Sequence, residues 1–390
     1  MKHALLKSTL ALSCALLVSN CTSLPDDHSI LSHDNHPMDH DELIVLDPPK
    51  DYVRHLGDLG LEVVEVHKLE SVGETLYHLR ITDGAHPYEG RDKHKEKFPD
   101  VLVDAHHLYE HQARKVDKSY TARKAAKWNK ESRTCSNGIQ IGMIDGFVDT
   151  SHPAFNGTKI TTKNFFYKGK QTANTGHGTA VASVMAGHAP YSGVLPGAEI
   201  VAANVFHAGS KGKPIGGTIS IMRAIDWLVS QNVPIINMSI GGSKNALIQR
   251  AIKHADEKGI IVVGSAGNSG PFSKKINYPS AYPSVIAITA VDRDNRNARF
   301  ATAGKYIDFA TPGVNIWTAH LKKGGKAMSG TSFAAPIFTA YAAAAMQHHK
   351  VKSTNDIKSY FKKYAKDTAE IGHDKYTGWG VVLVPPICGK

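Results

Sequence analysis

The sequence is poor in cysteine and has no hydrophobic run long enough to cross a membrane. Four cysteines occur in 390 residues, and Cys14 and Cys21 lie near the N-terminus, which excludes a disulfide-dense scaffold. The apolar run L-A-L-S-C-A-L-L-V-S has about 10 residues, whereas a membrane-spanning helix needs about 20. Together with Lys2 and Lys7, this short run predicts a secretory signal over residues 1–21.

The chain is basic but has no pattern typical of nucleic-acid binding. Its net charge is +11 and its pI is near 9.3, values that raise nucleic acid as a possible ligand. Lys and Arg are nevertheless spread along the chain, with a modest concentration between Arg114 and Lys130. We therefore interpret the charge as a solvated surface and expect no nucleic-acid partner.

Three short segments each place one type of catalytic residue in a suitable setting. Asp145 ends the apolar run I-Q-I-G-M-I-D-G, His177 lies in G-H-G-T, and Ser332 lies in S-G-T-S-F-A-A-P. Asp, His, Ser is one of the chain orders of the serine triad, whereas trypsin-like proteases run His, Asp, Ser. An alanine-rich stretch follows Ser332 and predicts a buried helix, so Ser332 is expected at a helix N-terminus that favours a developing negative charge.

Two neighbouring residues bear on these assignments. Asp149 is the competing carboxylate, but D-T-S-H-P is typical of a turn. We prefer Asp145 because it ends a strand-like run, and the carboxyl ends of parallel strands carry the sites of open α/β sheets. Pro336 is expected near the first turn of the helix after Ser332, where a missing N–H costs little.

The order and neighbours of these residues resemble the subtilisin-like serine proteases, or subtilases, over roughly residues 133–384. The alternation of strand and helix patterns along the same region predicts an α/β fold, a parallel sheet with helices on both faces. The resemblance implies peptide-bond hydrolysis through an acyl-enzyme intermediate. In that family an Asn in the A-G-N context donates to the oxyanion, and Asn268 matches it; the backbone N–H of Ser332 is the expected second donor.

The resemblance also implies where a substrate binds. The strand P-I-I-N-M-S-I-G-G resembles the family strand that pairs with an extended peptide. Its residues here would be Ser239, Ile240, Gly241 and Gly242. Asn277, in N-Y-P-S-A-Y-P-S, would lie at the floor of the pocket for the residue before the cleaved bond, and it carries no charge.

The chain divides into five segments. The segment F-P-D-V-L-V-D-A-H-H-L-Y-E resembles the end of a subtilase propeptide, which implies a small α+β domain before the protease. The polar segment 22–42 contains His and Asp, but their spacing fits no defined metal site. We predict a signal peptide (1–21), a polar linker (22–42), a propeptide-like domain (43–111), a basic linker (112–132) and the catalytic domain (133–390).

No cofactor is expected, and protein or peptide substrates and the chain's own propeptide are the expected partners of a monomer. The tight calcium site common in the family is expected to be absent, because Ala154 stands where the family usually has a carboxylate. The segment from His188 to Gly193 is also shorter than the family's calcium loop. Other calcium positions remain open.

The cysteines suggest export and leave two questions open. Cys21 resembles the lipidated cysteine of bacterial lipoproteins, although Asn20 departs from the usual small residue; ordinary signal cleavage nearby is the alternative. Only lipidation at Cys21 would bring the protein to a membrane. Cys135 and Cys388 would remain in the mature protein, where they predict a disulfide joining the ends of the catalytic domain, with two free thiols as the alternative.

The leading hypothesis is an exported serine endopeptidase, periplasmic or extracellular, that is made as a pro-enzyme. A non-catalytic binding protein on the same scaffold would need a broken triad, and all four chemical positions are present. An esterase using the same residues is a further alternative, and the peptide-pairing strand argues against it.

Overall fold

The computed structural model describes residues 29–31, 37–111, 114–115, 121–127, 135–166, 169–191, 193–209, 213–349 and 351–383. The predicted signal, Cys21 and Cys388 lie outside these residues. Within the described part of the chain, no helix combines the length and the apolar character that a bilayer crossing requires.

The central layer is a nine-stranded sheet in which every strand except the edge strand β19 runs parallel to its neighbours. Its inner strands are buried on both faces and read as continuous apolar runs, as expected for a parallel sheet covered by helices. The strand order is β19 (Ala365–Lys366), β20 (Val381–Val382), β16 (Phe309–Pro312), β15 (Val285–Val291), β14 (Ile261–Ser265), β12 (Ile235–Met238), β7 (Gln140–Asp145), β9 (Glu199–Asn204) and β8 (Ile160–Asn164).

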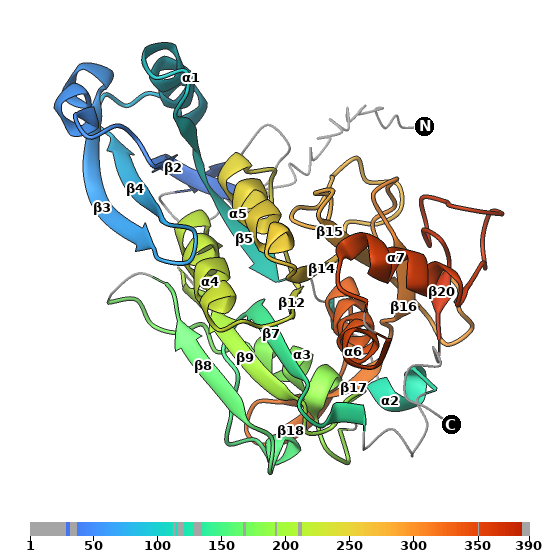
Figure 1. Cartoon of the computed structure of the whole chain (residues 1–390). Coiled ribbons are helices and arrows are strands. Elements are labelled where there is room, and N and C mark those ends of the chain that lie inside the picture. Colours follow the sequence, from blue (N-terminus) through green and yellow to red (C-terminus); the bar gives the residue numbers. More distant parts are fainter. Residues whose placement is uncertain are drawn as a thin grey trace, which may run out of the picture.

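Helices cover both faces of this sheet (Figure 1). Helices α3 (His177–Ala186) and α6 (Thr331–His349) share one hydrophobic core with Ile141 and Met143 of β7. Helices α4 (Thr218–Ser230) and α5 (Ala246–Glu257) share a second core with Ile144 of the same strand. Alternate residues of β7 thus face opposite cores, and the predicted α/β fold class is confirmed. The last helix, α7 (Thr354–Lys362), packs against α6 through Phe361 and Phe338.

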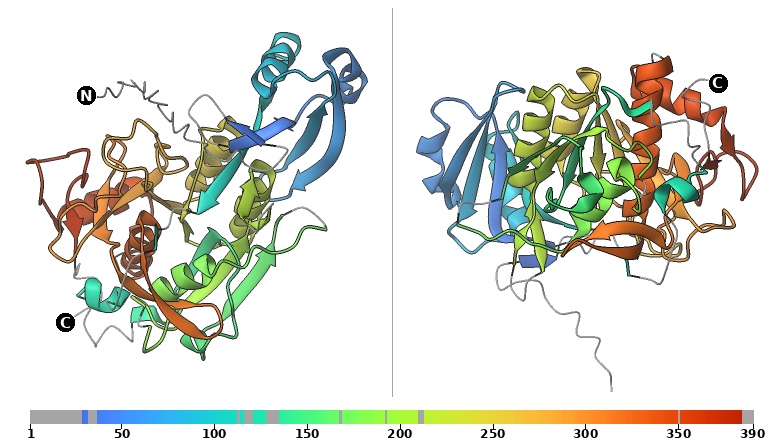
Figure 2. Two further views of the ribbon diagram at one scale, coloured as in Figure 1. Left: turned by 180° about the vertical axis from the view of Figure 1, so that it is seen from behind. Right: turned by 90° about the horizontal axis from the view of Figure 1, so that it is seen from below.

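The N-terminal unit is an antiparallel sheet that lies against α4 and α5, as both views in Figure 2 show. One face of its strands encloses a small core with Leu43, Leu79 and Val103, while Leu46 and Leu76 join the core of α4 and α5. Its elements are β1 (Ser29–Leu31), β2 (Pro37–Leu46), β3 (Leu61–Leu69), β4 (Glu74–Ile81), α1 (Pro87–Lys97) and β5 (Leu102–His111).

One local detail of this unit differs from the sequence expectation. Strand β2 begins at Pro37, inside the segment predicted as a polar linker. The stretch D-Y-V-R-H-L-G-D-L-G forms two short 3-10 helices, η1 (Tyr52–His55) and η2 (Gly57–Leu59). Gly60 ends η2 with a left-handed φ of 65°, which an L side chain rarely adopts.

Strand β5 joins the two units. Beyond its partner β2, it pairs antiparallel with β11 (Pro214–Gly217) and with β13 (Ile240–Gly241), and β11 pairs with β10 (His207–Ala208). A third sheet contains β17 (Ile316–His320), β18 (Gly324–Ser329) and β6 (Arg114–Lys115). The segment predicted as a basic linker therefore contains β6 and the short helix α2 (Ala122–Ala125).

Candidate active site

Asp145 ends β7 and contacts His177. The carboxylate is fully buried, and its Oδ1 lies 2.7 Å from Nδ1 of His177 and 2.6 Å from the backbone nitrogen of Gly146. A carboxylate oxygen only accepts, so Nδ1 of His177 carries the proton, and Nε2 is the accepting nitrogen of the neutral ring. This tautomer is the one that a general base requires at Nε2.

His177 begins α3 between two glycines that the backbone requires. Gly176 has a left-handed φ of 75° and precedes the first helical residue. A Cβ on Gly178 would lie 2.3 Å from the carbonyl oxygen of Gly146, which follows Asp145. The G-H-G sequence therefore lets the start of α3 approach the end of β7 closely enough for the contact between Asp145 and His177.

Asp149, the competing carboxylate, lies in the turn that the sequence predicted. Its Oδ1 accepts hydrogen bonds from the backbone N–H and the hydroxyl of Ser151, at 3.1 and 2.6 Å. Its own backbone N–H donates to Oγ1 of Thr179. Of the two carboxylates, the structure places Asp145 against the imidazole.

Ser332 is the second residue of α6 and is fully buried. Its hydroxyl donates to the carbonyl oxygen of Ser239 at 3.3 Å. The ring of the next residue, Phe333, lies with its centroid 5.6 Å from that of His177. The packing of α3 on α6 thus brings His177 to the N-terminus of α6, where Ser332 lies.

Pro336 lies inside α6, so the expectation that it sits near the first turn at little cost is wrong. It follows Ser332 by four residues and has no N–H to donate to the Ser332 carbonyl. The hydroxyl of Ser239 donates to that carbonyl instead, at 3.0 Å. Ser239 therefore contacts Ser332 twice, as acceptor for its hydroxyl and as donor to its carbonyl.

Asn268 follows β14 and is oriented by Thr331. Its Oδ1 accepts from the backbone N–H of Thr331 at 3.0 Å and from the Thr331 hydroxyl at 3.1 Å. A backbone N–H can only donate, so the carboxamide oxygen faces Thr331 and the Nδ2 amide is the donor end. The Thr331 hydroxyl also accepts from the backbone N–H of Gly267 at 3.1 Å.

The predicted substrate-binding strand is paired with β5. Ile240 lies opposite His111, and Gly241 lies opposite Glu110. Gly242 exchanges backbone hydrogen bonds with Tyr278, at 2.8 and 3.1 Å. A Cβ on Gly242 would lie 2.5 Å from the ring of Tyr109, so the glycine allows this tyrosine to pack against the strand.

A second strand on the other side of β5 was missed by the sequence analysis. In β11, Gly216 lies opposite Tyr109 and Gly217 lies opposite Leu108. A Cβ on Gly217 would lie 2.2 Å from Nε2 of His106, so this glycine also permits a close approach. The signal that would have revealed this strand is the pair of adjacent glycines in P-I-G-G.

Asn277 is buried beneath the loop that carries Asn268. Its Nδ2 donates to the carbonyl oxygen of Ser265, at the end of β14, over 2.8 Å. A Cβ on Gly267 would lie 3.1 Å from Cβ of Asn277. Asn277 thus brings a neutral amide to the base of this loop.

The residues at the family's usual calcium position do not fit a tight calcium site. Ala154 is buried, has no side-chain oxygen, and its carbonyl accepts the backbone N–H of His188 at 2.8 Å. The neighbouring His152 places Nε2 2.9 Å from the carbonyl oxygen of Gly324. A hard cation needs several oxygen ligands, and this place supplies no carboxylate.

Comparison with known proteins identifies the family. The Subtilase family model matches residues 136–380. The chain belongs to the subtilase family of serine proteases. Subtilisin amylosacchariticus from Bacillus subtilis subsp. amylosacchariticus is 30% identical over 303 residues, which cover 75% of this chain and 76% of that protein.

Two other similar proteins are matched over a smaller share of their own length. The subtilase is 31% identical over 220 residues to the minor extracellular protease Epr of Bacillus subtilis (strain 168), covering 55% of this chain and 33% of that relative. Its fold is similar to the crystal structure of fervidolysin from Fervidobacterium pennivorans, a keratinolytic enzyme related to subtilisin. The TM-score is 0.74 at 21% identity, covering 93% of this chain and 63% of that chain.

Proposed function

We propose that this subtilase is an exported endopeptidase that hydrolyses peptide bonds in proteins and is made as a pro-enzyme. The observation that carries the proposal is the contact between Asp145 and His177 at the N-terminus of the helix that bears Ser332. The orientation of Asn268 by Thr331 adds the donor that acyl transfer requires.

The proposed reaction uses each residue in one role. Ser332 Oγ attacks the carbonyl carbon of the scissile bond while His177 Nε2 takes its proton, and Asp145 stabilises the imidazolium. Nδ2 of Asn268 and the backbone N–H of Ser332 donate to the oxyanion. His177 then returns the proton to the leaving amine, and a water molecule, deprotonated by His177, hydrolyses the acyl-enzyme and releases Ser332.

We infer that extended peptides bind as an added strand between β11 and β13. Strand β5 lies there, and its backbone pairs with Gly216 and Gly217 on one side and with Ile240 and Gly241 on the other. A substrate in the same place would gain main-chain hydrogen bonds with little dependence on its side chains. This arrangement favours an endopeptidase over an esterase, whose small substrates need no such ladder.

Hydrogen bonds between β5 and the catalytic domain support the proposal that the N-terminal unit is an inhibitory propeptide. Asp104 Oδ2 accepts the backbone N–H of Ala246 at the start of α5, at 2.8 Å. The Thr218 hydroxyl donates to the carbonyl of His107, and the Tyr109 hydroxyl donates to that of Ser243, each at 3.0 Å. While β5 remains there, another peptide cannot bind.

We further infer that the propeptide is cleaved between His111 and Arg114. Strand β5 ends with His111 opposite Ile240, one residue from Ser239, which contacts Ser332. The chain resumes in β6, where Arg114 lies opposite Ser329, three residues before Ser332. Strands β5 and β6 therefore end and begin near Ser332, and a cut between them separates the N-terminal unit from the catalytic domain.

We propose export through the segment 1–21, with lipidation at Cys21 or ordinary cleavage nearby, and a disulfide between Cys135 and Cys388. Cys135 is buried just before β7, and Cys388 lies outside the described residues. Intact mass with N-terminal sequencing distinguishes the two forms of the N-terminus, and non-reducing peptide mapping distinguishes the bridge from two free thiols.

A fluorophosphonate probe and a casein digest test the proposed activity together. The mature protein should be labelled on Ser332 and should degrade casein, and the label should abolish degradation. Labelling without proteolysis, accompanied by hydrolysis of simple esters, would instead support an esterase. Absence of both labelling and proteolysis in the processed protein would support a binding protein.

A further inference from the structure

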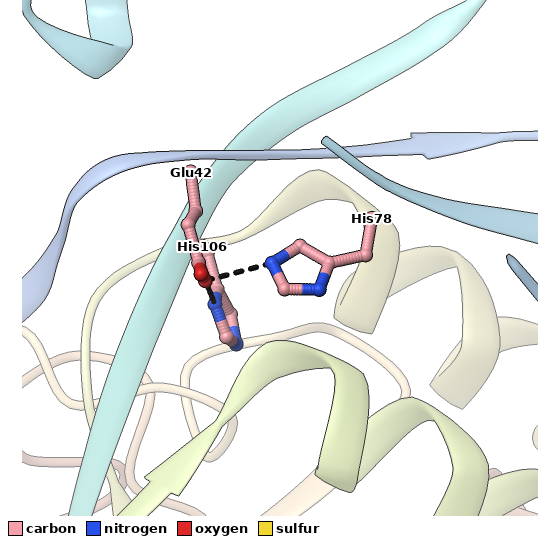
Figure 3. Close-up of side chains that lie close together, drawn as sticks. All are labelled: Glu42, His78 and His106. Carbon is pink, nitrogen blue, oxygen red and sulfur yellow. Dashed lines mark hydrogen bonds and ion pairs between the residues drawn. The ribbon is translucent and has the colours of Figure 1, made fainter. Parts of the chain in front are cut away.

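Three side chains from three neighbouring strands meet outside the catalytic site, on the N-terminal sheet. They are Glu42 of β2, His78 of β4 and His106 of β5, and Figure 3 shows both imidazoles directed at the same carboxylate. Oε2 of Glu42 lies 2.8 Å from Nε2 of His78 and 2.5 Å from Nδ1 of His106. The side chains of the two histidines are only 2% and 1% exposed, and that of Glu42 is 13% exposed.

The cluster lies on the face of the sheet that covers the catalytic domain. Leu46 and Leu76, on the same strands, belong to the core that contains α4 and α5. The imidazole of His106 packs directly on the backbone of β11, where a Cβ on Gly217 would lie 2.2 Å from its Nε2. Burying two imidazoles and a carboxylate costs free energy that apolar side chains would not cost. A ligand that uses all three groups would offset that cost.

Two imidazole nitrogens and one carboxylate oxygen form a ligand set that suits Zn²⁺. The three ligand atoms lie within 4.8 Å of one another. Around a tetrahedral Zn²⁺, with bonds of about 2.0–2.2 Å, ligand atoms are roughly 3.3–3.5 Å apart. Small rotations of Glu42 would open the present contacts to that spacing and place the ion between the three groups.

We propose that Glu42, His78 and His106 bind Zn²⁺, with water as the fourth ligand. The ion takes the place of the protons that the two imidazole nitrogens share with the carboxylate. A neutral ring then carries its proton on its other nitrogen, and only a protonated ring releases one to the solvent. Calcium and magnesium, which take mostly oxygen ligands, do not suit this set. The site is separate from the triad and performs no step of peptide hydrolysis.

The position of the site predicts its effect. The ion links β2, β4 and β5, and β5 continues from His106 into the segment between β11 and β13. A ligand that binds the folded N-terminal unit stabilises that unit and the complex it forms. Zinc therefore stabilises the pro-enzyme and slows loss of the N-terminal unit from the catalytic domain.

The first experiment measures binding to the full exported chain carrying Ser332→Ala, so that no cleavage intervenes. Isothermal titration with zinc chloride at about pH 8, above the ordinary imidazole pKa of about 6.5, should give one tight site and a higher melting temperature. Calcium chloride at the same concentration should give neither. Absence of stoichiometric zinc binding would overturn the proposal, and it would leave the proposed protease activity untouched because the assay requires no catalysis.

Matched variants then locate the ion. His78→Gln and His106→Gln should each weaken zinc binding at least about 10-fold, since loss of mere outer partners already costs 10–100-fold. His94→Gln is the control, because His94 is a fully buried imidazole of the same unit that contacts Tyr52 instead of the cluster. Zinc affinity that is unchanged in the two cluster variants, or equally reduced in the control, would contradict the assignment.

If the His78 and His106 variants fail to fold, the zinc ligands can still be identified in the protein that keeps all three side chains. X-ray absorption of the zinc-loaded Ser332→Ala protein should show two imidazole ligands at about 2.0–2.1 Å with oxygen completing the shell. A shell of sulfur, or of oxygen alone, would place the ion elsewhere and overturn the proposal.

Discussion

Thr331 fixes the orientation of Asn268 with two hydrogen bonds, one from its backbone N–H and one from its hydroxyl. The residue immediately before the proposed nucleophile thus orients the proposed oxyanion donor. Thr331 therefore couples Ser332, which would attack the carbonyl carbon, to Asn268, which would donate to the carbonyl oxygen. A shift of Thr331 would disturb both, whereas a substitution of its hydroxyl alone tests the orientation of Asn268.

Thr331→Val should lower kcat while changing KM little, because the hydroxyl contacts Asn268 and not the substrate. The fall should be smaller than for Asn268→Ala, where loss of an oxyanion donor costs about 10²–10³-fold. Thr339→Val is the matched control: it removes a hydroxyl of the same helix that contacts Asn237 and Ala335. A kcat for Thr331→Val equal to that of the control would show that the backbone N–H of residue 331 suffices.

Ser332→Ala should abolish proteolysis and propeptide cleavage together. Removing the nucleophile lowers kcat by about 10⁶-fold in related proteases. In a host without other proteases, the variant should persist as the uncut pro-enzyme, while the unsubstituted protein should begin at residue 112, 113 or 114. Normal processing of Ser332→Ala would show that Ser332 does not cut the propeptide, and a mature N-terminus far from this segment would contradict the proposed cleavage position.

Cleavage should show no strict preference for Arg or Lys before the scissile bond. Asn277 brings a neutral amide to the base of the Asn268 loop, whereas pockets that select basic residues carry a carboxylate. Profiling with a peptide library checks this, and Asn277→Asp should shift the profile toward basic residues. A library result dominated by Arg and Lys in the unsubstituted enzyme would rule out this role for Asn277.

Chelation should change the stability of the mature enzyme little. Ala154 offers no carboxylate at the family's usual calcium position, and its carbonyl accepts the N–H of His188. Thermal unfolding of the mature enzyme with and without chelator measures the effect, and the proposed zinc site is absent from that form. A large drop in melting temperature would indicate another calcium site in the catalytic domain.

Acidification should destabilise the N-terminal unit, because burial lowers the pKa of His94 from 6.5 to about 4. Between pH 6.5 and about pH 4, His94 is protonated in the unfolded chain but stays neutral in the folded unit. The contribution of His94 to the free energy of unfolding is therefore complete above pH 6.5 and is lost as the pH falls toward 4. Unfolding of the Ser332→Ala pro-enzyme in metal-free buffer checks the slope.

His94→Gln should flatten that pH dependence, because it removes the titrating imidazole and keeps a polar partner for the Tyr52 hydroxyl. His55→Gln is the control, since the side chain of His55 is 40% exposed. An equal slope in the His94 variant and in the unsubstituted protein would show that other groups govern acid unfolding.

The triad segments and the parallel sheet could be predicted because each depends on residues close together in the sequence. The triad segments G-H-G-T and S-G-T-S-F-A-A-P were recognisable because short-range backbone geometry requires their glycines and small residues, as the approach of Gly178 to Gly146 illustrates. The parallel sheet followed from buried apolar strands alternating with helices. These features predicted the catalytic fold and the residues proposed for catalysis.

Long-range pairings were not predictable in the same way. The pairing of β5 with Gly216 and Ile240 joins segments about a hundred residues or more apart, and no local pattern specifies it. The hydroxyl of Ser239 that offsets the missing N–H of Pro336 is likewise distant in sequence. Glu42, His78 and His106 meet only because three strands adopt one register, so their spacing matched no metal motif.

The pairing of β5 on both sides has a kinetic consequence. The proposed cleavage near residue 112 would break the covalent chain but would remove none of the ladder partners of β5. The N-terminal unit would then remain on the catalytic domain as a bound product. The onset of activity would be governed by dissociation of that unit and not by cleavage of the bond. Because dissociation is opposed by rebinding, the lag before full activity depends on how dilute the newly cut protein is.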